Sequence, residues 1–535
     1  MSQIVQGIPD IVAQGIAGGW KAHDSSQLTQ NTHIEADVLI IGTGAGGGTA
    51  AEILTLAGLK VVMIEEGPLK TSNQFDMKEA TAFTDLYQDG MGRATADGAI
   101  TIMQGRCVGG STTVNWTSSF RTPPETLAHW TDAHGLKGFS VDEMAPWFKL
   151  MEERLGIAPW ALPPNNNNHV IAQGCEALGY NWHVIPRNVR GCWNLGYCGL
   201  GCPTNAKQSM LVTTIPGALK QGAELYYLAH ADTLIIENEQ VKGVRCSAMR
   251  KDYLNRTGVT LEVRARHTIL SCGGINGPAL LLRSKAPDPY DRIGKRTFMH
   301  PVPFSLGDFE QGINGFSGAP QSVFSDHFQW RDGTTGPMGF KIEVAPMQPS
   351  FASVVMMGHG QFHHEQMQRL SHLNLMLALL RDGFHEESQG GSISLNDFGG
   401  PVIDYPITDY MHDGIRRALK TMAEVQFAAG AKRVRPVHTQ STYSTTLQDA
   451  HRQIDELPLR TNGVRLGCAH VMGGLAMGED VKTSVTNSRG KFHHLDHLSV
   501  LDGSLFPTSI GANPQLSIYG TVARAATELA KSLKA

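Results

Sequence analysis

The sequence predicts an α/β protein that is built around a parallel, doubly wound sheet and carries a second domain with a mixed β-sheet and helices. The first part follows from two short apolar strand patterns, at residues 36–41 and 60–64, with a glycine-rich turn and a helix pattern between them. The second part follows from residues 301–460, where strand-like runs such as Val354–Met357 occur with a long helix pattern at Ile415–Gly430. A chain of 535 residues is also too long for a single hydrophobic core.

The first strand, ADVLII at residues 36–41, runs directly into the turn GTGAGGG at residues 42–48. Residues 49–57 have the small and apolar pattern of a helix, which Gly58 ends, and KVVMI at residues 60–64 is the second strand. Strands that a helix connects in this way run parallel, because the crossover returns the chain to the same end of the sheet. We therefore expect a Rossmann-like domain near the start of the chain.

The turn contains the pattern GxGxxG at Gly42, Gly44 and Gly47. The first glycine permits the turn, the second lets the backbone approach a pyrophosphate, and the third allows close packing of helix and strand. The helix start supplies N–H donors to an anion. Glu65 ends the second strand, where an acidic side chain can accept from ribose hydroxyls, and Glu66 competes for that contact. The motif predicts a bound dinucleotide without separating NAD from FAD.

The bulk composition excludes some classes of function. Hydrophobic residues make up 41% and charged residues 18% of the chain, and its net charge of −4 argues against a nucleic-acid partner. No apolar run reaches the ~18–20 residues that a transmembrane helix needs. The first basic residue is Lys21, so the N-terminus does not resemble a secretory signal. We expect a cytoplasmic protein, and association with a membrane surface stays open.

Five motifs along the chain, in this order, carry a resemblance to a known family. They are IEEGP (64–68), GRCVGGSTTVN (105–115), ILSCGGINGPALLLRS (269–284), GCAHVMGGLAMG (467–478) and VLDGSLFPTSIGANPQLSIY (500–519). The set resembles the glucose–methanol–choline (GMC) flavoenzymes from about residue 36 to the C-terminus. GCPTNAKQS (201–209) and LALLRDGF (377–384) are most similar to the long-chain alcohol oxidase branch.

The resemblance implies an FAD-dependent oxidoreductase that acts on CH–OH donors, with FAD bound non-covalently. In some members a histidine before the asparagine of the GGS…N loop is bonded to the flavin, and Val114 stands at that position. It implies a discontinuous FAD-binding domain (36–120, 205–300, 461–535), a substrate-binding domain (121–204, 301–460) and an N-terminal arm (1–35). The expected FAD contacts are Gly42, Gly44, Gly47, Glu65, Gly105, Arg106, Gly109, Gly110, Ser111, Thr112, Asn115, Asp502, Gly503 and Asn513.

The resemblance also assigns a catalytic pair, His470 and Asn513. Alcohol oxidation by hydride transfer to flavin N5 needs a base for the hydroxyl proton, and the pKa of histidine, ~6.5, suits that task. His470 matches the family's histidine at the flavin face. Asn513 matches a position that is His or Asn in the family, and an asparagine there can hold the alcohol oxygen but cannot titrate. His470 is therefore the expected base.

Cys192, Cys198 and Cys202 lie in the glycine-rich segment GCWNLGYCGLGCP. Three thiolates in such a segment can hold a [3Fe-4S] cluster, and their spacing is similar to that of a family relative that passes electrons to a cytochrome. A disulfide and free thiols are the alternatives. The histidine-rich segments HGQFHHE (359–365) and HHLDH (493–497) offer ligand types for a metal, but we expect ordinary surface or core histidines there.

The leading hypothesis is oxidation of a primary alcohol, long-chain or aryl, to the aldehyde. Apolar stretches at Val354–Met357 and Leu373–Leu380 favour such a substrate, although stretches of this kind are more often core than pocket. Alternatives are a sugar or polyol dehydrogenase that uses the cluster to reach a cytochrome or quinone, a non-redox FAD-dependent lyase, and a subunit that only relays electrons. The electron acceptor, whether oxygen, quinone or cytochrome, stays open.

Overall fold

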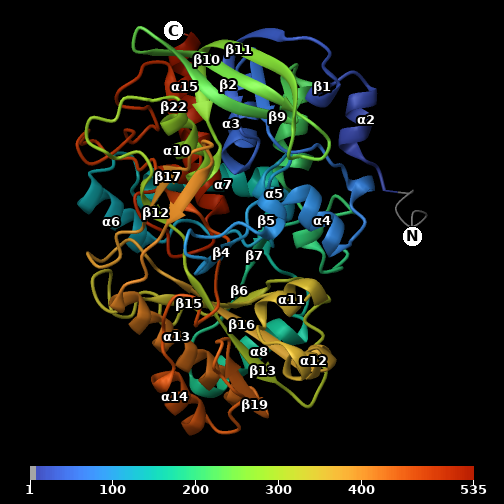
Figure 1. Ribbon diagram of the computed structural model, residues 1–535, viewed down its shortest axis with the longest axis vertical. Helices are drawn as coiled ribbons and strands as arrows, with labels where there is room; N and C mark the ends of the chain where they lie inside the picture. The colour runs from blue at the N-terminus through green and yellow to red at the C-terminus, as the bar shows by residue number, and fades with distance from the viewer. Residues whose placement is uncertain (1–7, 535) are drawn as a thin grey trace.

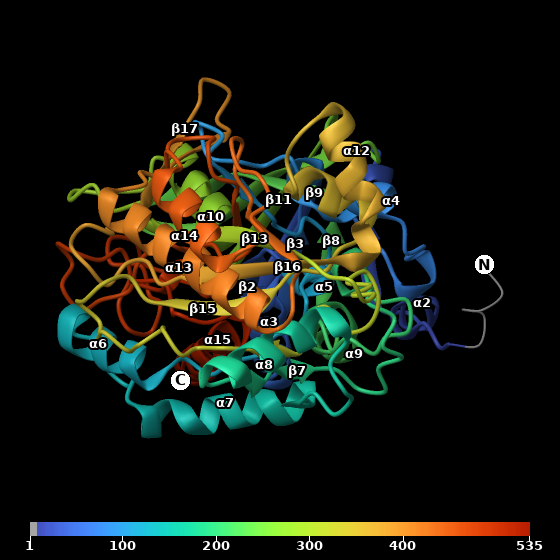
Figure 2. The same cartoon turned by 90° about the horizontal axis from the view of Figure 1, so that it is seen from below.

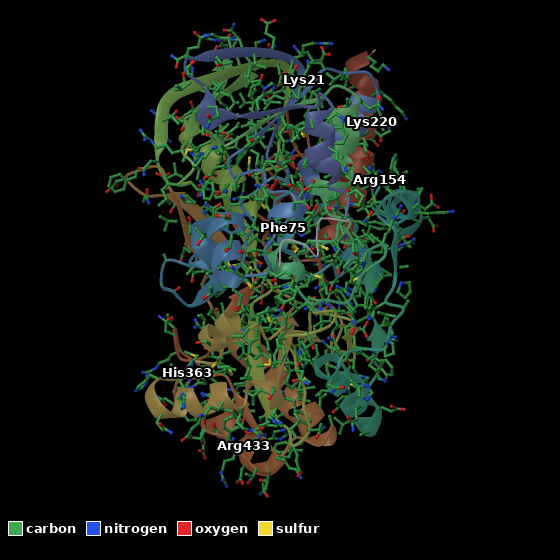
Figure 3. All side chains as sticks on the ribbon, turned by 90° about the vertical axis from the view of Figure 1, so that its right-hand side faces the viewer. Lys21, Phe75, Arg154, Lys220, His363 and Arg433 are labelled. Atoms are coloured by element: carbon green, nitrogen blue, oxygen red, sulfur yellow. The ribbon has the colours of Figure 1, made fainter. Side chains whose placement is uncertain are left out.

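Two large β-sheets organise the computed structural model, which describes residues 8–534 (Figure 1). Residues 1–7 of the expected N-terminal arm lie outside the described residues. In Figure 3, Lys21 on the first sheet and Arg433 on the second lie towards opposite ends of the molecule. The observed mixture of sheets and helices confirms the predicted α/β class.

The first sheet contains the predicted parallel core. Its strand order is β1-β8-β3-β2-β11-β10-β9, with β22 beside β11. Strands β1, β8, β3, β2, β11 and β22 run parallel to their neighbours, and β10 and β9 extend the sheet antiparallel. The strands are β1 (Lys21–Asp24), β2 (Thr32–Ile41), β3 (Val61–Glu65), β8 (Glu224–Tyr227), β9 (Ala229–Glu237), β10 (Gln240–Met249), β11 (Arg256–Leu270) and β22 (Leu498–Val500).

Helix α3 (Ala45–Leu56) follows β2 at the glycine-rich turn and packs against α15 (Gln515–Lys534), the last helix of the chain. Helix α7 (Val141–Leu155) packs against α15 as well. Its buried side chains, such as Phe148, belong to the core around the first sheet. Within the segment 121–204, α7 thus packs with the first sheet, and β1 is an edge strand of that sheet.

The second large sheet has the order β15-β16-β13-β20-β4, with β19 also paired to β13. Helices α8 (Asn166–Leu178) and α13 (Asp409–Ala428) pack on it, and Figure 2 shows α13 across β15 and β16. Every residue of β16 (LNLMLALL) is buried, because alternate side chains pack into two separate apolar clusters, one of them shared with α8 and α13. The strands are β4 (Ile100–Ile102), β13 (Val302–Asp308), β15 (Phe340–Val344), β16 (Leu373–Leu380), β19 (Arg433–Pro436) and β20 (Leu466–Cys468).

Three smaller sheets and several short helices complete the described chain. The strand order β18-β17-β12-β21 forms one sheet, and β14 with β6 and β5 with β7 form two ribbons. These strands are β5 (Ile157–Pro159), β6 (His183–Val184), β7 (Pro186–Asn188), β12 (Lys295–Phe298), β14 (Val323–Phe324), β17 (Gly391–Leu395), β18 (Pro401–Asp404) and β21 (Met472–Gly473). The other α-helices are α2 (Ile11–Ala17), α4 (Glu79–Leu86), α5 (Ser111–Val114), α6 (Pro124–His134), α9 (Thr214–Lys220), α10 (Gly273–Arg283), α11 (Pro349–Val355), α12 (Gly360–Gln368) and α14 (Leu447–Glu456).

One predicted strand is wrong. Val354–Met357 begins at the end of α11, where Pro349 occupies the first helical turn, a position that suits proline. The paired β-branched residues gave a local strand signal that the helix overrides. Helix α13 covers most of the predicted range Ile415–Gly430 and begins earlier, at Asp409. Across residues 8–534, the structure has no helix with the length and apolar character needed to cross a bilayer.

Candidate functional site

A cavity of about 780 Å³ collects most of the residues that the sequence analysis selected. It is lined by the turn between β2 and α3, the loop before α5, the start of α10, the His470 loop and the start of α15. Strands β13, β15 and β16 of the second sheet line it as well. His470 and every expected FAD contact except Gly47 and Gly109 face this space.

The glycine-rich turn requires glycine for two separate reasons. Gly42 has a φ of 97°, and a Cβ on it would lie 2.3 Å from the carbonyl oxygen of Ser271. Gly47 lies on α3 with its backbone against the turn, and a Cβ there would lie 1.9 Å from the oxygen of Gly42. Gly47 therefore shapes the turn from behind, while the start of α3 at Ala45 and Gly46 faces the cavity.

The two glutamates at the end of β3 have different partners. The Glu65 carboxylate accepts from the backbone N–H of Thr43 at 3.1 Å and of Gly67 at 2.9 Å, and also from the Thr43 hydroxyl. Glu66 forms an ion pair with Arg106 at 3.0 Å and lies 3.6 Å from His230. Burial raises the pKa of Glu65. Burial also opposes ionisation of Glu66, but His230 and Arg106 outweigh it and lower its pKa to about 2.

Hydrogen bonds join the loops that surround the cavity. The Ser111 hydroxyl accepts from the Gly105 N–H at 3.0 Å, and Asn115 donates to Gln515 at the start of α15 at 2.8 Å. Asp502 accepts from the Gly273 N–H at 2.7 Å, which ties the C-terminal segment to α10. Gly109 does not line the cavity, but its N–H donates to the Thr43 hydroxyl at 3.1 Å and so holds its loop against the glycine turn.

This cradle fits FAD. Its volume lies within the range of about 300–1,000 Å³ typical of cofactor pockets. At Gly44, a Cβ would find no atom nearer than 3.9 Å, so the cavity reaches the backbone where a pyrophosphate would lie. The starts of α3, α10 and α15 all contribute to the lining, and helix starts present N–H donors to negative charge.

His470 lies in the loop between β20 and β21 and contacts a second histidine. Its Nδ1 lies 3.3 Å from Nδ1 of His300, and Nε2 of His300 accepts from the backbone N–H of Gly511 at 3.1 Å. Burial, and secondly the positive charge of Lys341, lowers the pKa of His470 to about 3. His470 is therefore neutral at neutral pH, as a base must be before it takes a proton.

Asn513 belongs to a buried triangle with two charged residues of β15. Lys341 Nζ donates to Asn513 Oδ1 at 3.1 Å and forms an ion pair with Glu343 at 3.0 Å. Asn513 Nδ2 in turn donates to the second carboxylate oxygen of Glu343 at 3.1 Å. Burial lowers the pKa of Lys341 to about 8, although Glu343 acts in the opposite direction.

The part of the cavity towards the second sheet is largely apolar. Its lining side chains come from two neighbouring strands, β13 and β16, from α11 and from the loop after α5. The apolar ones are Trp116, Val302, Phe304, Phe351, Leu377 and Leu379, and the polar side chains of Gln321 and Glu343 line the cavity as well. The apolar stretch Leu373–Leu380 thus supplies pocket as well as core, whereas Val354 of the other stretch is 61% exposed.

The three clustered cysteines make separate polar contacts. Cys192 Sγ accepts from the Asn194 N–H at 3.4 Å, Cys198 Sγ lies 3.5 Å from a guanidinium nitrogen of Arg187, and Cys202 pairs with Thr204. Within residues 8–534, the structure contains no group of three or more His, Cys, Asp or Glu side chains arranged to hold a metal ion. The geometry therefore does not support the expected cluster ligands Cys192, Cys198 and Cys202.

Sequence reasoning missed three side chains that contact His470 or Asn513: His300, Lys341 and Glu343. The run FKIEV of β15 did carry a signal, because two charged residues alternate with apolar ones and so share one face of the strand. His300 stands in MHPV after β12, where nothing local separates it from an ordinary buried histidine.

Two family profiles and several curated proteins match this chain. The N-terminal profile of the GMC oxidoreductase family matches residues 83–302, and its C-terminal profile matches residues 387–521. The long-chain-alcohol oxidase FAO1 of Arabidopsis thaliana is 25% identical over 523 residues, which cover 94% of this chain and 67% of that protein. The 6'''-hydroxyparomomycin C oxidase of Streptomyces lividus is 26% identical, with 93% of this chain and 92% of that protein covered.

Solved structures share the fold. Formate oxidase of Aspergillus oryzae superposes with a TM-score of 0.69 at 16% identity, covering 94% of this chain and 99% of that chain. Pyridoxine 4-oxidase from Mesorbium loti superposes with a TM-score of 0.67 at 18% identity, covering 92% of this chain and 98% of that chain.

Proposed function

Because the chain belongs to the GMC oxidoreductase family and is an FAD-dependent oxidoreductase acting on CH–OH donors, we propose that it oxidises a primary alcohol to the aldehyde at the His470 end of its cavity. The single observation that carries this proposal is that His470 and Asn513 both line the cavity that also contains the dinucleotide turn.

The cavity lining supports a division of labour among the predicted cofactor residues. Gly42 and Gly44 on the turn, with the start of α3, would hold the pyrophosphate, and Glu65 or Glu66 would meet the ribose. The loop Gly105–Asn115 and the segment from Asp502 to α15 would flank the ring system. When bound, FAD supplies the hydride acceptor, its N5 atom. In this proposal residues 36–120, 205–300 and 461–535 contribute most of the FAD site.

His470 and Asn513 act on the hydroxyl group of the alcohol. Neutral His470 takes the hydroxyl proton as the carbon–hydrogen bond breaks. Asn513 donates an N–H to the same oxygen and stabilises the negative charge that develops there. The buried surroundings of both residues strengthen these interactions, because less water competes for them.

An apolar substrate suits the chamber beyond this pair. Aromatic and aliphatic side chains such as Phe304, Phe351 and Leu377 line it, and they offer no partners for the hydroxyl groups of a sugar. Among the relatives, the name of the long-chain-alcohol oxidase FAO1 points the same way. We therefore propose a long-chain or aryl primary alcohol as substrate, with oxygen as the favoured electron acceptor.

The proposal is tested by anaerobic mixing of the purified flavoprotein with a panel of alcohols. Primary alcohols with long apolar chains or aryl groups should bleach the flavin absorbance and yield the aldehyde, and glucose and sorbitol should not. Turnover is then compared with oxygen and with an artificial acceptor. Protein that holds FAD but is bleached by none of the alcohols would overturn the proposal, and bleaching by sugars alone would overturn the substrate class.

A further inference from the structure

Lys341 is a buried cation that the alcohol chemistry proposed above does not use. It lies on β15, whose residues alternate between two faces. Phe340, Ile342 and Val344 point into the core of the second domain, while Lys341 and Glu343 occupy the opposite face, beside Asn513. The exposed fraction is 1% for Lys341 and 0% for Glu343, so solvent pairs with neither charge.

The contacts of Lys341 stabilise its positive charge within the interior. Glu343 supplies the counter-ion at 3.0 Å, and the Asn513 carboxamide supplies an acceptor at 3.1 Å. The ring of Phe120 lies 3.1 Å from Nζ and that of Phe324 lies 4.3 Å away, a cation–π arrangement. Lys341 does not line the cavity, whereas Glu343 and Asn513 do. Lys341 therefore contacts the cavity lining through these two residues, and its charge also acts on His470.

The two charges determine which way round the Asn513 amide lies. An ammonium group can only donate and a carboxylate can only accept, so Oδ1 must face Lys341 and Nδ2 must face Glu343. Nδ2 carries two hydrogens, and Glu343 accepts a hydrogen bond from one of them. The second N–H can point into the cavity, so the amide presents only a donor to a ligand there. The reversed amide would place N–H against ammonium and oxygen against carboxylate, two repulsive contacts in a buried site.

We propose that Lys341 is a positioning residue for alcohol oxidation: together with Glu343 it fixes the Asn513 carboxamide as a hydrogen-bond donor to the alcohol oxygen. This inference rests on the proposed function of the same site. It explains why a strand of the second sheet buries an ion pair beside the cavity, where two apolar residues would pack without the cost of desolvating charge. Asn513, held in this orientation, favours the negatively charged form of the alcohol oxygen, because that form is the strongest hydrogen-bond acceptor.

The test is a double-mutant cycle in the flavin-loaded enzyme with Lys341→Met, Asn513→Ala and the combination. The rate constant of anaerobic flavin reduction is measured, together with the dissociation constant of a fluorinated primary alcohol, read from the shift in flavin absorbance. A fluorinated alcohol ionises readily but resists oxidation. Lys432→Met, at an exposed lysine that pairs with Glu310 far from the cavity, is the matched control and should behave as wild type.

We expect Lys341→Met to slow flavin reduction by at least about tenfold and to weaken binding of the fluorinated alcohol by at least about tenfold. These effects are part of what the loss of one hydrogen-bond donor to an oxyanion costs. In the Asn513→Ala background the same change should cost less than about threefold, because residues that act through one another are not additive. Equal costs in both backgrounds would overturn the inference, as would a Lys341→Met enzyme within about twofold of wild type.

Loss of Lys341 alone leaves Glu343 buried without a counter-ion, which can prevent folding. The cycle is therefore run in parallel with Lys341→Met/Glu343→Gln, which removes both charges, and the same non-additivity with Asn513→Ala is expected. If no alcohol reduces the flavin of the wild-type enzyme, the proposed function is refuted. If alcohols do reduce it but the effects of the Lys341 and Asn513 substitutions are additive, only the role of Lys341 is refuted.

Discussion

Nδ1 of His300 faces Nδ1 of His470 at 3.3 Å, while the other ring nitrogen of His300 accepts from the Gly511 N–H. A backbone N–H can only donate, so Nε2 of neutral His300 carries a lone pair and its ring proton lies on Nδ1. His300 then donates to Nδ1 of His470, and His470 carries its own proton on Nε2. Burial lowers the pKa of both rings, so both are neutral at neutral pH.

This order of hydrogen bonds sets a condition on the proposed base. To accept the hydroxyl proton at Nε2, His470 must first hold its own proton on Nδ1 and donate to His300. His300 then loses the bond from Gly511. An unpaired buried N–H costs about 1–3 kcal/mol. This cost is small compared with the about 8 kcal/mol or more by which enzymes lower the activation free energy of a reaction. The tautomer that serves as base is therefore accessible as a minor form.

Nitrogen-15 NMR of histidine-labelled holoenzyme can identify the tautomer. Without alcohol, we expect the signal of His470 to report protonation on Nε2, and the spectrum of His470→Gln assigns that signal. A bound, non-reactive fluorinated alcohol should increase the share of the form protonated on Nδ1. A His470 that carries its proton on Nδ1 at rest would mean that Gly511 does not control the pair.

Replacement of His470 should separate chemistry from cofactor binding. We expect His470→Ala to keep its flavin, because in our proposal the glycine turn and the Asp502 segment would hold the cofactor elsewhere in the cavity. Its rate of flavin reduction by alcohol should fall by about 10²- to 10⁴-fold, the usual contribution of a positioned base. The matched control is His363→Ala, whose ring contacts the backbone of Ser353 away from the cavity. A His470→Ala enzyme that reduces flavin at nearly the wild-type rate would exclude His470 as the base.

The pH dependence of the rate of flavin reduction should reflect the ionisation of two buried groups, His470 and Lys341. His470 has a pKa of about 3, so its neutral form is lost only in strong acid, and the rate should stay level down to about pH 5. Lys341 has a pKa of about 8, so its charge, and its hold on Asn513, is lost as the pH rises through that value. We therefore expect the rate to fall on the alkaline side. Stopped-flow measurement between about pH 5 and 10 checks this, and an alkaline fall that persists in Lys341→Met would assign it to another group.

Local sequence was enough to predict the dinucleotide turn, because the geometry of Gly42–Gly47 depends on the adjoining strand and helix. It was not enough for the reacting end, where β15 reaches Asn513 only through long-range strand pairing with β16. Lys341 and Glu343 could have been found from their alternation with apolar residues, but their partner could not. The same limit explains the wrong strand prediction at Val354–Met357, where packing of α11 outweighed a local preference for strand. It also explains why the place of α7 was not predicted, because α7 packs with the first sheet through contacts with the distant helix α15.

Val114 should leave the flavin without a covalent bond to the protein. Its side chain lines the cavity and is almost fully buried, at the place where some family members have a flavin-linked histidine. A valine side chain has no nucleophilic atom. Precipitation of the holoenzyme with acid should therefore release all of the FAD into the supernatant, and yellow colour that stays with the washed pellet would contradict this.

Gly44 offers the sharpest test of where the cofactor lies. A Cβ at this residue would meet no atom of the protein within 3.4 Å, since the nearest, Gly110 Cα, is 3.9 Å away, and the φ of −69° suits any residue. Gly44→Ala should therefore fold with a melting temperature close to that of wild type, measured on the apoprotein. Its methyl group would stand where the backbone has to approach the pyrophosphate, so FAD affinity should fall by at least about tenfold, a cost of about 1.4 kcal/mol. Gly58→Ala, beyond the end of α3 and outside the cavity lining, is the contrasting control: its φ of 85° makes alanine unfavourable there, so its melting temperature should fall, but it should keep its flavin. If Gly44→Ala binds FAD as tightly as wild type does, the pyrophosphate does not lie against this turn.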